Sequence, residues 1–502
     1  MIETSRRWRI RPSQWVLGII LVGALALRVN EISQQSLWID ELLSLEISNG
    51  RGFLEAGLPR GQLMDPAPDP TDLTNAASVW RIVPEQKCES HPPLYFLILR
   101  VWREMFPGDA AARMLTVLIS VVAVFLFYDV GRLLGGTSAG LWAAAIAAVA
   151  GVQIDTAQEI RHYPMLLCMT LATVSALLRI ERDGFSRKRG VILAVSLLGL
   201  MWTHYFGIAP AFALAIYAIL RFRGKERKAT LAIFAISGVI FLVLWGPILW
   251  QQHYSVEAAL VRVHEAEHGH LKNTFDRLSM IPIRLLGEPL RNSHSSGAIA
   301  GIALLIFPLE LRRRGKLLLP ILLMVLPIAL VLGMDLWQSS WELQRLRYVI
   351  TCTAGFYVLL ALPIIDRKWL RHLLPASAVL YGLISLPATY TPWKEDFRGV
   401  AGYIEQRGQP GDPVICYSNT GDDFEGSMYL GLRHYLAASH PMVIMNQCAD
   451  ERLISQLRSR GNIWIIMGWR WGTPIEREIL PGVKILDARR EEKLGMLYRV
   501  GY

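Results

Sequence analysis

Residues 113–167, RMLTVLISVVAVFLFYDVGRLLGGTSAGLWAAAIAAVAGVQIDTAQEIRHYPMLL, alternate long apolar runs with short polar turns. The runs approach the roughly 20 apolar residues that a helix needs to cross a hydrocarbon core of about 30 Å. The first turn contains the basic Arg132, whereas the second contains the acidic Glu159 beside Arg161. The stretch therefore predicts neighbouring membrane-spanning helices whose polar turns lie on opposite sides of a membrane.

The composition of the whole chain also indicates a membrane protein. Of its 502 residues 52% are hydrophobic and 19% are charged, and the mean hydropathy is +0.32, which is too apolar for an ordinary soluble enzyme of this size. The net charge of +10 resides in short basic clusters between apolar runs rather than in a continuous stripe, so no nucleic-acid partner is expected. The five cysteines show neither CxxC pairs nor zinc spacing, which argues against a metal-cysteine site.

Apolar segments of spanning length recur through the first four-fifths of the chain, and eleven are predicted. They are residues 15–30, 112–131, 138–154, 163–180, 190–202, 206–220, 229–250, 297–311, 317–334, 346–365 and 372–386. The first follows several arginines like a signal peptide, but no small-residue cleavage site comes after it, so we interpret it as a retained anchor. The fold class predicted is a polytopic α-helical membrane protein.

The basic clusters orient these segments, because Lys and Arg accumulate on the cytoplasmic side of a membrane. With the N-terminus inside, the clusters at 182–189, 221–228, 312–316 and 367–371 all fall inside. The odd number of spans then places the C-terminus outside, at the inner (plasma) membrane. We predict a membrane domain at 1–390, which includes an outer loop at 31–111.

The remaining residues, 391–502, have the composition of a small soluble α/β domain on the outer side. Helical patterns lie at 395–406 and 428–436, and strand-like runs lie at 412–418 and 462–468. Cys416 and Cys448 would share an oxidising compartment there, but we do not expect them to form a disulfide.

Two adjacent carboxylates follow the first span in SLWIDELLSLEIS at 36–48. Asp40 and Glu41 lie a few residues beyond the membrane surface, where they could take a proton from an acceptor hydroxyl or bind a divalent cation. The alternative is the acidic first turn of an interfacial helix, stabilised by the helix dipole.

Two outer stretches supply histidine candidates. His91 begins HPPLYFLILRVW, where a cation or a hydrogen-bond donor can meet a phosphate, although a plain helix start explains the prolines equally well. His204 and Tyr205 lie in the short turn WTHYFG, where they could bind a ligand or belong to an interfacial aromatic belt.

A third outer turn, QEIRHY, brings together the carboxylate of Glu159, the guanidinium of Arg161 and the phenol of Tyr163. Ionisable groups at membrane depth are costly and are functional candidates by default. A structural ion pair between Glu159 and Arg161 is the competing explanation.

Arg345, Arg347 and Tyr348 lie on the outer side just before the tenth span, against the rule that outer loops are poor in basic residues. Guanidinium groups bind phosphate bidentately, so a lipid phosphate is a suitable partner. Pairing with Glu342 or with anionic headgroups is the alternative.

These motifs together resemble a known family. LWIDE, HPPLYFLILRVW, AQEIRHYPMLL and the tail that begins WKEDFRGVAGYIEQRGQPGD are similar, in order and spacing, to the protein-mannosyltransferase-like and aminoarabinose-transferase-like GT-C glycosyltransferases, that is, glycosyltransferase family 39-like proteins. The resemblance covers most of the chain. It departs from the family at His162-Tyr163-Pro164, where a hydrophobic residue is expected before the tyrosine and no proline after it.

The resemblance implies a catalytic base at Asp40 with Glu41 beside it, a second acid at Glu159 and contact between His91 and a donor phosphate. The full set of catalytic candidates is Asp40, Glu41 and Glu159, and the donor- or phosphate-binding candidates are His91, Arg161, Tyr163, His204, Tyr205, Arg345, Arg347 and Tyr348. The need for a metal is left open, and a divalent cation would be held by Asp40 and Glu159.

The function implied is transfer of a hexose or a pentose from a polyprenyl-phosphate donor to a lipid, glycan or protein acceptor on the outer membrane face. The resemblance also implies inversion at the anomeric carbon. The partners are then the donor lipid, membrane lipids and the acceptor. A lipid-linked sugar flippase or transporter, or a non-enzymatic membrane scaffold, is the alternative, although ionisable residues gather at the outer ends of the spans rather than within them.

Overall fold

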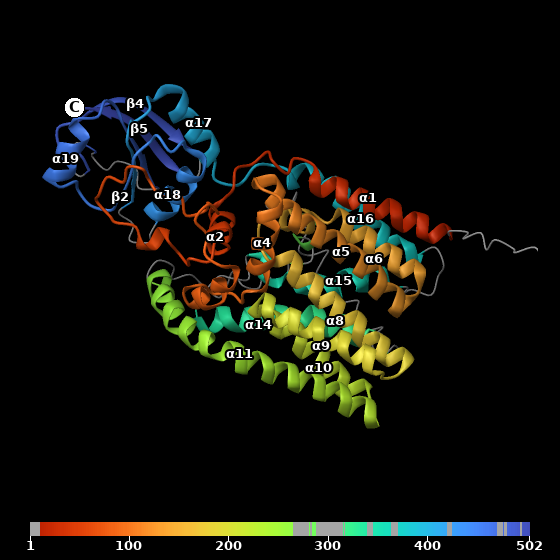
Figure 1. Ribbon diagram of the computed structural model, residues 1–502. Coiled ribbons are helices and arrows are strands. Elements are labelled where there is room, and N and C mark those ends of the chain that lie inside the picture. The colour runs from red at the N-terminus through yellow and green to blue at the C-terminus, as the bar shows by residue number, and fades with distance from the viewer. Residues whose placement is uncertain are drawn as a thin grey trace, which may run out of the picture. The chain divides into compact units, whose positions relative to one another are not determined.

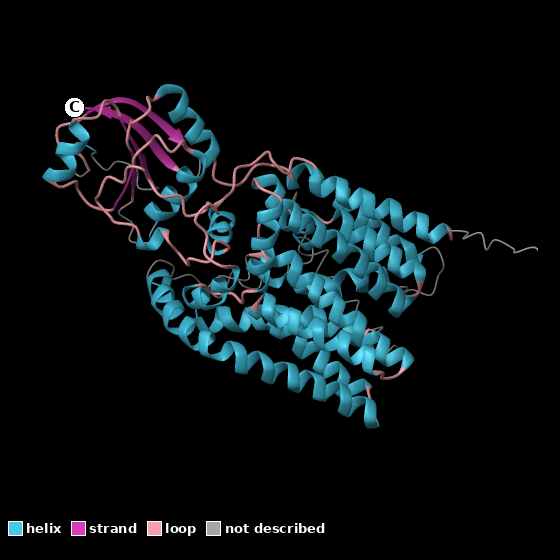
Figure 2. Cartoon of the chain, viewed as in Figure 1, coloured by secondary structure: helices cyan, strands magenta, loops and turns pink. Residues whose placement is uncertain are grey.

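The computed structural model describes residues 11–264, 281, 284–287, 315, 317–338, 345–362, 370–418, 424–468, 475, 479–491 and 494–502. The chain divides into two compact units (Figure 1). The membrane unit comprises residues 1–32, 90–95 and 112–391, and the outer unit comprises residues 33–89, 96–111 and 392–502. The described part of the membrane unit is helical, whereas the outer unit combines helices with the sheet (Figure 2).

Apolar helices of different lengths make up the described part of the membrane unit. They are α1 (Pro12–Val29), α5 (Asp109–Gly135), α6 (Thr137–Val149), α7 (Gly151–Ala157), α8 (Tyr163–Asp183), α9 (Arg187–Thr203), α10 (Ile208–Arg221), α11 (Gly224–His264), α14 (Leu318–Gln338), α15 (Thr353–Ala361) and α16 (Leu370–Thr389). Six described helices are long and apolar enough to cross a membrane, and the pair α6 and α7, bent by 60°, would make a seventh span. The multi-pass helical fold is thereby confirmed, whereas the number of spans stays a prediction.

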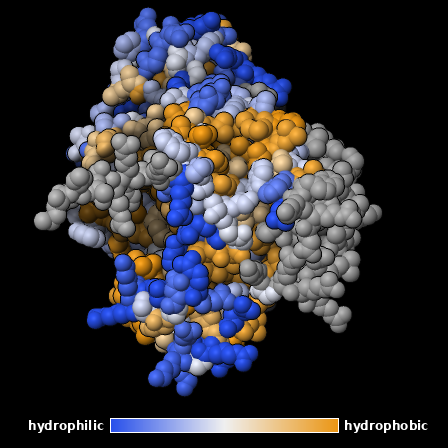
Figure 3. Space-filling view, turned by 90° about the vertical axis from the view of Figure 1, so that its right-hand side faces the viewer, coloured by the Kyte–Doolittle hydropathy of each residue, from blue (hydrophilic) through white to orange (hydrophobic). Residues whose placement is uncertain are grey.

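The predicted spans within the described residues coincide with these helices. The segment 138–154 corresponds to α6 and α7 together, and 346–365 begins as the 3₁₀ helix η7 (Leu346–Cys352) before α15. The segment 297–311 lies outside the described residues. The apolar residues of these helices are exposed where lipid would cover them, for example Val239, Val243 and Leu244 on α11. A broad hydrophobic area is visible on the surface (Figure 3).

A fully buried arginine fixes the bend between α6 and α7. Arg28 on α1 donates to the carbonyl oxygens of Ala147 and Ala148 at 2.9 and 3.0 Å, and to the Ser120 hydroxyl at 2.8 Å. These carbonyls end α6 and have no partner within the helix, so the cation neutralises a helix C-terminus. Gln158 then donates to the carbonyl oxygen of Arg28 at 3.0 Å. The turn that contains Glu159 is thus held against the end of α1.

The outer unit is built on a five-stranded sheet in the order β2-β1-β3-β5-β4. The strands are β1 (Val414–Tyr417), β2 (Met442–Met445), β3 (Ile463–Met467), β4 (Lys484–Glu491) and β5 (Gly495–Gly501), and the helices α17 (Phe397–Arg407), α18 (Phe424–Tyr435) and α19 (Glu451–Arg458) complete the tail. β1 pairs in parallel with β2 and β3, and all its residues are buried, as expected for a central parallel strand. The predicted α/β tail is confirmed, although the sequence pattern did not show β2, β4, β5 or α19. Cys416 is buried and Cys448 is exposed, and the structure shows no bond between them.

The outer loop contributes α2 (Ile39–Ile47), α3 (Ile82–Glu85), the short 3₁₀ helices η1 (Glu55–Gly57), η2 (Val79–Arg81) and η3 (Gln86–Cys88), and most of α4 (Leu94–Met105). It covers the edge strand β2, because the amide of Met64 donates to the carbonyl of Met442 at 3.0 Å and the amide of Gly61 donates to that of Ile444 at 2.8 Å. This pairing protects a sheet edge that would otherwise expose backbone groups. The outer loop therefore forms one compact unit with the tail rather than with the spans that flank it in sequence.

Candidate functional site

Three histidines that are distant in sequence meet in the membrane unit. His91 precedes α4, His162 is the residue before α8, and His204 follows the end of α9. Their ring centroids are separated by 4.4 Å (His91 to His162), 4.5 Å (His162 to His204) and 4.8 Å (His91 to His204). All three side chains are buried. We call these residues the histidine cluster.

Aromatic rings and an arginine continue this cluster. The ring of Tyr163 lies 4.6 Å from that of His162, and the Phe206 ring stacks on His204 at 4.8 Å with an interplanar angle of 22°. Tyr348 contacts Phe206 at 5.2 Å, and the Arg347 guanidinium carbon lies 5.5 Å from the Tyr348 ring and 5.9 Å from the Tyr163 ring. The structure thus brings the predicted Tyr163, Arg347 and Tyr348 together with two of the predicted histidines.

Burial and positive neighbours determine the charge of the cluster. Burial, followed by repulsion from His91, lowers the pKa of His204 well below its usual value, and the same two causes lower the pKa of His162. Both imidazoles are therefore neutral at pH 7. The guanidinium groups of Arg161 and Arg347, both of which act on His162, contribute positive charge to this region.

Glu159 and Arg161 lie on the turn that leads into α8. Both side chains are buried, and the amide of Arg161 donates to the carbonyl oxygen of Glu159 at 2.7 Å, which makes the turn tight. The turn ends at Tyr163 and Pro164 because proline favours the first turn of a helix. The proline that departs from the family pattern thus sits where it starts α8 without distortion.

Two of the candidates have contacts typical of structural residues. The hydroxyl of Tyr205 accepts from the indole of Trp245 at 2.8 Å and donates to Gln252, both on α11. Arg345 is exposed and donates to the Tyr348 hydroxyl at 3.3 Å. Their assignment to donor binding stays a prediction.

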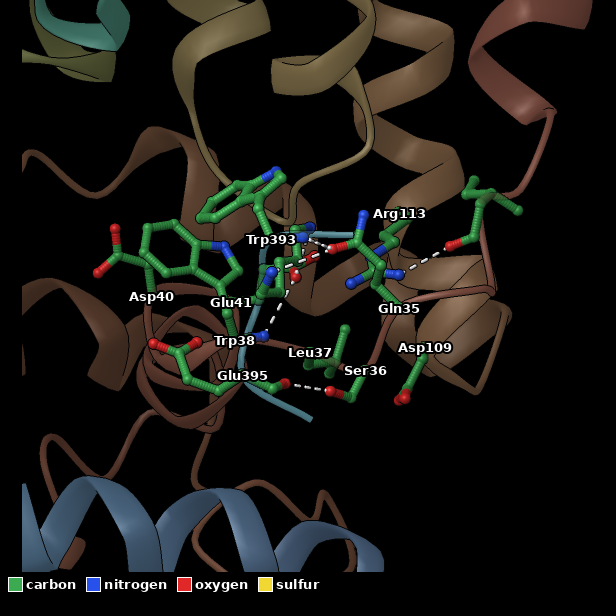
Figure 4. Close-up of polar contacts among 12 residues, drawn as sticks. Gln35, Ser36, Leu37, Trp38, Asp40, Glu41, Asp109, Arg113, Trp393 and Glu395 are labelled. Carbon is green, nitrogen blue, oxygen red and sulfur yellow. Dashed lines mark hydrogen bonds and ion pairs between the residues drawn. The ribbon is translucent and has the colours of Figure 1, made fainter. Parts of the chain in front are cut away.

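Asp40 and Glu41 belong to the outer unit and differ from each other. Asp40, at the start of α2, is half-buried, and its carboxylate points away from Glu41 (Figure 4). Glu41 is fully buried and accepts a hydrogen bond from Lys394 at 2.9 Å. Of the two, Asp40 has the more accessible carboxylate.

The Glu41 pair lies within a network that joins the outer loop to the start of the tail. The side chain of Glu41 also accepts from the amide of Trp38 at 3.4 Å, and thereby caps α2. The indoles of Trp38 and Trp393 pack edge to face at 5.1 Å, and the amide of Trp393 donates to the side-chain oxygen of Gln35 at 2.9 Å. These contacts favour a positioning role for Glu41, which holds α2 and hence Asp40.

One group of three or more ligand-type side chains within the described residues has spacing suited to a metal ion, and it is the histidine cluster. One side-chain nitrogen of each histidine lies within 4.8 Å of the other two. This set differs from the carboxylates Asp40 and Glu159, which were the predicted cation ligands.

Sequence reasoning missed two residues of these sites. His162 was noticed only as a departure from the family pattern, and Lys394 was noticed only within the string WKEDFRG. His162 had a usable signal, because a polar residue replaced an expected hydrophobic one. Lys394 had none, since its partner Glu41 lies more than 350 residues away in the chain.

One part of the chain is similar in sequence to a known protein family. Residues 90–250 match the sequence profile of the family described as dolichyl-phosphate-mannose-protein mannosyltransferase. This segment contains the histidine cluster and the turn with Glu159. A search of curated proteins found no match.

Several solved structures are similar over most of the chain, and two of them, with TM-scores above 0.5, share its fold. The oligosaccharyltransferase of Archaeoglobus fulgidus in its apo form is 13% identical, with a TM-score of 0.51, and the match covers 88% of this chain and 65% of that one. The mycobacterial arabinofuranosyltransferase AftD is 12% identical, with a TM-score of 0.51, over 98% of this chain but 40% of that one. ArnT from Cupriavidus metallidurans, bound to undecaprenyl phosphate, is 14% identical over 98% of both chains, with a TM-score of 0.48.

Proposed function

We propose that this chain, a member of the GT-C glycosyltransferases, transfers a sugar from a polyprenyl-phosphate donor to an acceptor hydroxyl at the outer face of the membrane. The observation that carries the proposal is the buried histidine cluster with Arg347, Tyr163 and Tyr348 at the ends of apolar helices. Such a cluster combines hydrogen-bond donors with guanidinium charge, which suits a phosphate.

The reaction needs two contributions from the protein, because the donor already carries a phosphate leaving group. A base removes the proton of the acceptor hydroxyl while its oxygen bonds to the anomeric carbon. The bond between that carbon and the phosphate oxygen breaks, and the lipid phosphate departs with the electron pair. Asp40 is the proposed base, and His91, Arg161 and Arg347 stabilise the charge that develops on the phosphate.

The relation between Asp40 and Glu41 supports this division of roles. Glu41 is committed to a buried ion pair with Lys394, whereas Asp40 is half-buried at the first turn of α2. A base must reach its substrate, so the more accessible carboxylate is the better candidate. Glu159 is the second acidic residue of the proposed site, and its buried position on the turn before α8 suits a role in positioning the donor.

The donor sugar, a hexose or a pentose, is identified by assay. The purified full-length protein is incubated with a panel of polyprenyl-phosphate sugars, and the released polyprenyl phosphate is measured together with the glycosylated acceptor. Release with transfer to a lipid, glycan or protein supports the proposal. Movement of intact donor between vesicle leaflets without release would instead identify a flippase. If neither release nor movement is detected, the protein is a non-enzymatic scaffold.

We further propose that the protein resides in the inner (plasma) membrane with its N-terminus in the cytoplasm and its tail outside. The basic clusters at 182–189 and 221–228 support this orientation. The test is a reporter that is active solely in the cytoplasm, fused after Tyr502. Activity of this reporter would show that the topology is the reverse of the one proposed, and that Asp40 lies on the cytoplasmic side.

A further inference from the structure

One histidine of the cluster has a tautomer that the backbone fixes. The amide of Phe206 donates to Nδ1 of His204 at 2.9 Å. A neutral imidazole that accepts at Nδ1 carries its proton on Nε2, so Nε2–H is a hydrogen-bond donor. Stacking against Phe206 holds the ring in this orientation. The backbone of the turn after α9 thus selects which atom of His204 can bind a ligand.

This donor has no protein acceptor among the residues that the structure describes. Nε2 of His204 is fully buried and makes no hydrogen bond within them, and the whole residue is 4% exposed. A buried N–H without an acceptor costs free energy, and such groups are rare in proteins. The rings of His91 and His162 lie within 4.8 Å of the His204 ring. The donor therefore belongs to a site whose acceptor comes from outside the described residues.

A metal ion is a poor match for this arrangement. A histidine that binds a metal through one nitrogen donates its other N–H to an acceptor, which fixes its tautomer. At His204 the second nitrogen, Nδ1, accepts instead, from the Phe206 amide. The guanidinium groups of Arg161 and Arg347, which lower the pKa of His162, would also repel a cation. The same features favour a ligand that is negatively charged and rich in acceptor oxygens.

We propose that His204 is a neutral hydrogen-bond donor whose Nε2–H binds an oxygen of the lipid-linked phosphate. This assignment rests on the proposed function and specifies the atom and the tautomer that act there. A neutral donor of this kind stabilises the phosphate both before and after the sugar leaves, beside the charge supplied by Arg161 and Arg347. The histidine cluster is then a phosphate subsite rather than a metal centre.

The test compares binding of undecaprenyl phosphate to the full-length protein and to two variants. His204→Phe keeps an aromatic ring for the stack on Phe206 but removes the donor, and we expect binding to weaken about tenfold to a hundredfold. His204→Gln restores an N–H donor at a similar distance from the backbone, and most of the affinity should return. Undecaprenol, which has no phosphate, should show no difference among the three proteins.

His372→Phe is the matched control. Its Nδ1 also accepts a hydrogen bond, from the indole of Trp142 at 3.0 Å, but this histidine is exposed and outside the cluster. Its affinity for undecaprenyl phosphate should equal that of the natural protein. Thermal unfolding of each variant verifies that it is folded. If His204→Phe unfolds at a lower temperature than the natural protein, the proposal is tested by His204→Gln alone, which must then bind undecaprenyl phosphate.

Several outcomes would overturn the proposal. Equal loss of affinity in His204→Phe and His204→Gln would mean that His204 is structural. One tightly bound zinc ion per chain, lost in His204→Gln, would identify a metal ligand. Dependence on His204 for inorganic phosphate but not for undecaprenyl phosphate would assign the subsite to free phosphate. Unchanged binding of undecaprenyl phosphate by His204→Phe would overturn the donor role of His204, even if sugar transfer is intact. If binding depends on His204 but no sugar is transferred, the donor role is supported and the proposed function is refuted.

Discussion

Two polar centres, the histidine cluster and the Glu41–Lys394 pair, are both buried but differ in how far the described residues satisfy them. Lys394 binds Glu41 at 2.9 Å, and Glu41 also caps α2, so the pair is complete within the chain. His204 instead has a buried donor without an acceptor among the described residues. Burial alone therefore does not identify a functional site. A buried donor that the described residues leave unsatisfied, next to other polar side chains, is instead a candidate for ligand binding.

The largest effect is expected at the residue next to the completed pair. Asp40→Asn keeps the shape of the side chain but cannot accept a hydroxyl proton, so turnover should fall by roughly 10²- to 10⁴-fold. Donor binding should be retained. The measurement is steady-state transfer with a polyprenyl-phosphate sugar identified in the panel assay.

Glu41→Gln, at the adjacent residue, is the control variant for Asp40→Asn. It should reduce the stability of the protein more than Asp40→Asn does, and reduce turnover less, because Glu41 is fully buried and paired with Lys394. Near-normal transfer by Asp40→Asn in a correctly inserted protein would move the base to Glu41 or Glu159.

The next largest effect is expected on stability, when one partner of the Glu41–Lys394 pair is removed. Lys394→Met leaves the fully buried Glu41 carboxylate uncompensated, and the free energy of unfolding of the outer unit should fall by about 3–5 kcal/mol. Denaturant unfolding followed by tryptophan fluorescence measures it, since Trp38 and Trp393 adjoin the pair. The double variant Glu41→Gln with Lys394→Met should recover part of the loss.

The control for this prediction is an exposed pair in the same unit. Arg407 and Asp487 lie 3.6 Å apart with side chains 56% and 34% exposed. Arg407→Met should cost less than about 1 kcal/mol, because exposed ion pairs are weak. Equal losses in the two variants would contradict the assignment of the Glu41 pair as the stabilising contact.

Arg347 tests the ligand side of the comparison. Arg347→Ala removes a charged donor beside Tyr163 and Tyr348, and donor binding should weaken by about 1.5–3 kcal/mol. The loss should raise KM more than it lowers kcat if binding is uniform in ground and transition states. Arg347→Lys should restore part of the affinity, since charge without the bidentate fork is a weaker match.

Arg345→Ala is the control for the effect of Arg347→Ala on donor binding. Arg345 is exposed, so its loss should be the smaller of the two. A larger effect from Arg345 than from Arg347 would shift the phosphate site away from the histidine cluster.

The smallest effect, when expressed per pH unit, concerns the pH dependence of the outer unit. Burial raises the pKa of Glu46 from 4.5 to about 8, although its carboxylate accepts the Glu55 amide at 2.8 Å. The folded state then holds a proton that the unfolded state releases, so this contribution to stability is full below about pH 4.5. It is lost as the pH rises toward 8, with a slope of about 1.4 kcal/mol per pH unit.

Glu46→Gln stays neutral and should flatten this slope between about pH 5 and pH 8. Unfolding at several pH values measures it. Glu104→Gln, which removes a carboxylate that is 53% exposed, should leave the slope as it is. An unchanged slope in Glu46→Gln would mean that other groups bind the proton.

The sequence by itself determined the features that depend on local composition. Apolar runs of spanning length predicted the helices of the membrane unit, because the cost of exposing backbone groups to lipid leaves the helix as the favoured state of such a run. Alternation and turn residues predicted a soluble α/β tail. The motifs around Asp40, His91 and Glu159 also gave the candidate residues, since ionisable groups at the ends of apolar runs are conspicuous in one dimension.

Tertiary structure alone decided what those residues contact. The outer loop pairs with β2, and Glu41 pairs with Lys394, through contacts between segments hundreds of residues apart. No local pattern encodes such pairs, because they depend on how separate elements pack. The tautomer of His204 is of the same kind, since it follows from the backbone conformation of one turn. The sequence thus specified which polar groups are present. Packing specified which of them have hydrogen-bond partners within the protein and which have none among the described residues.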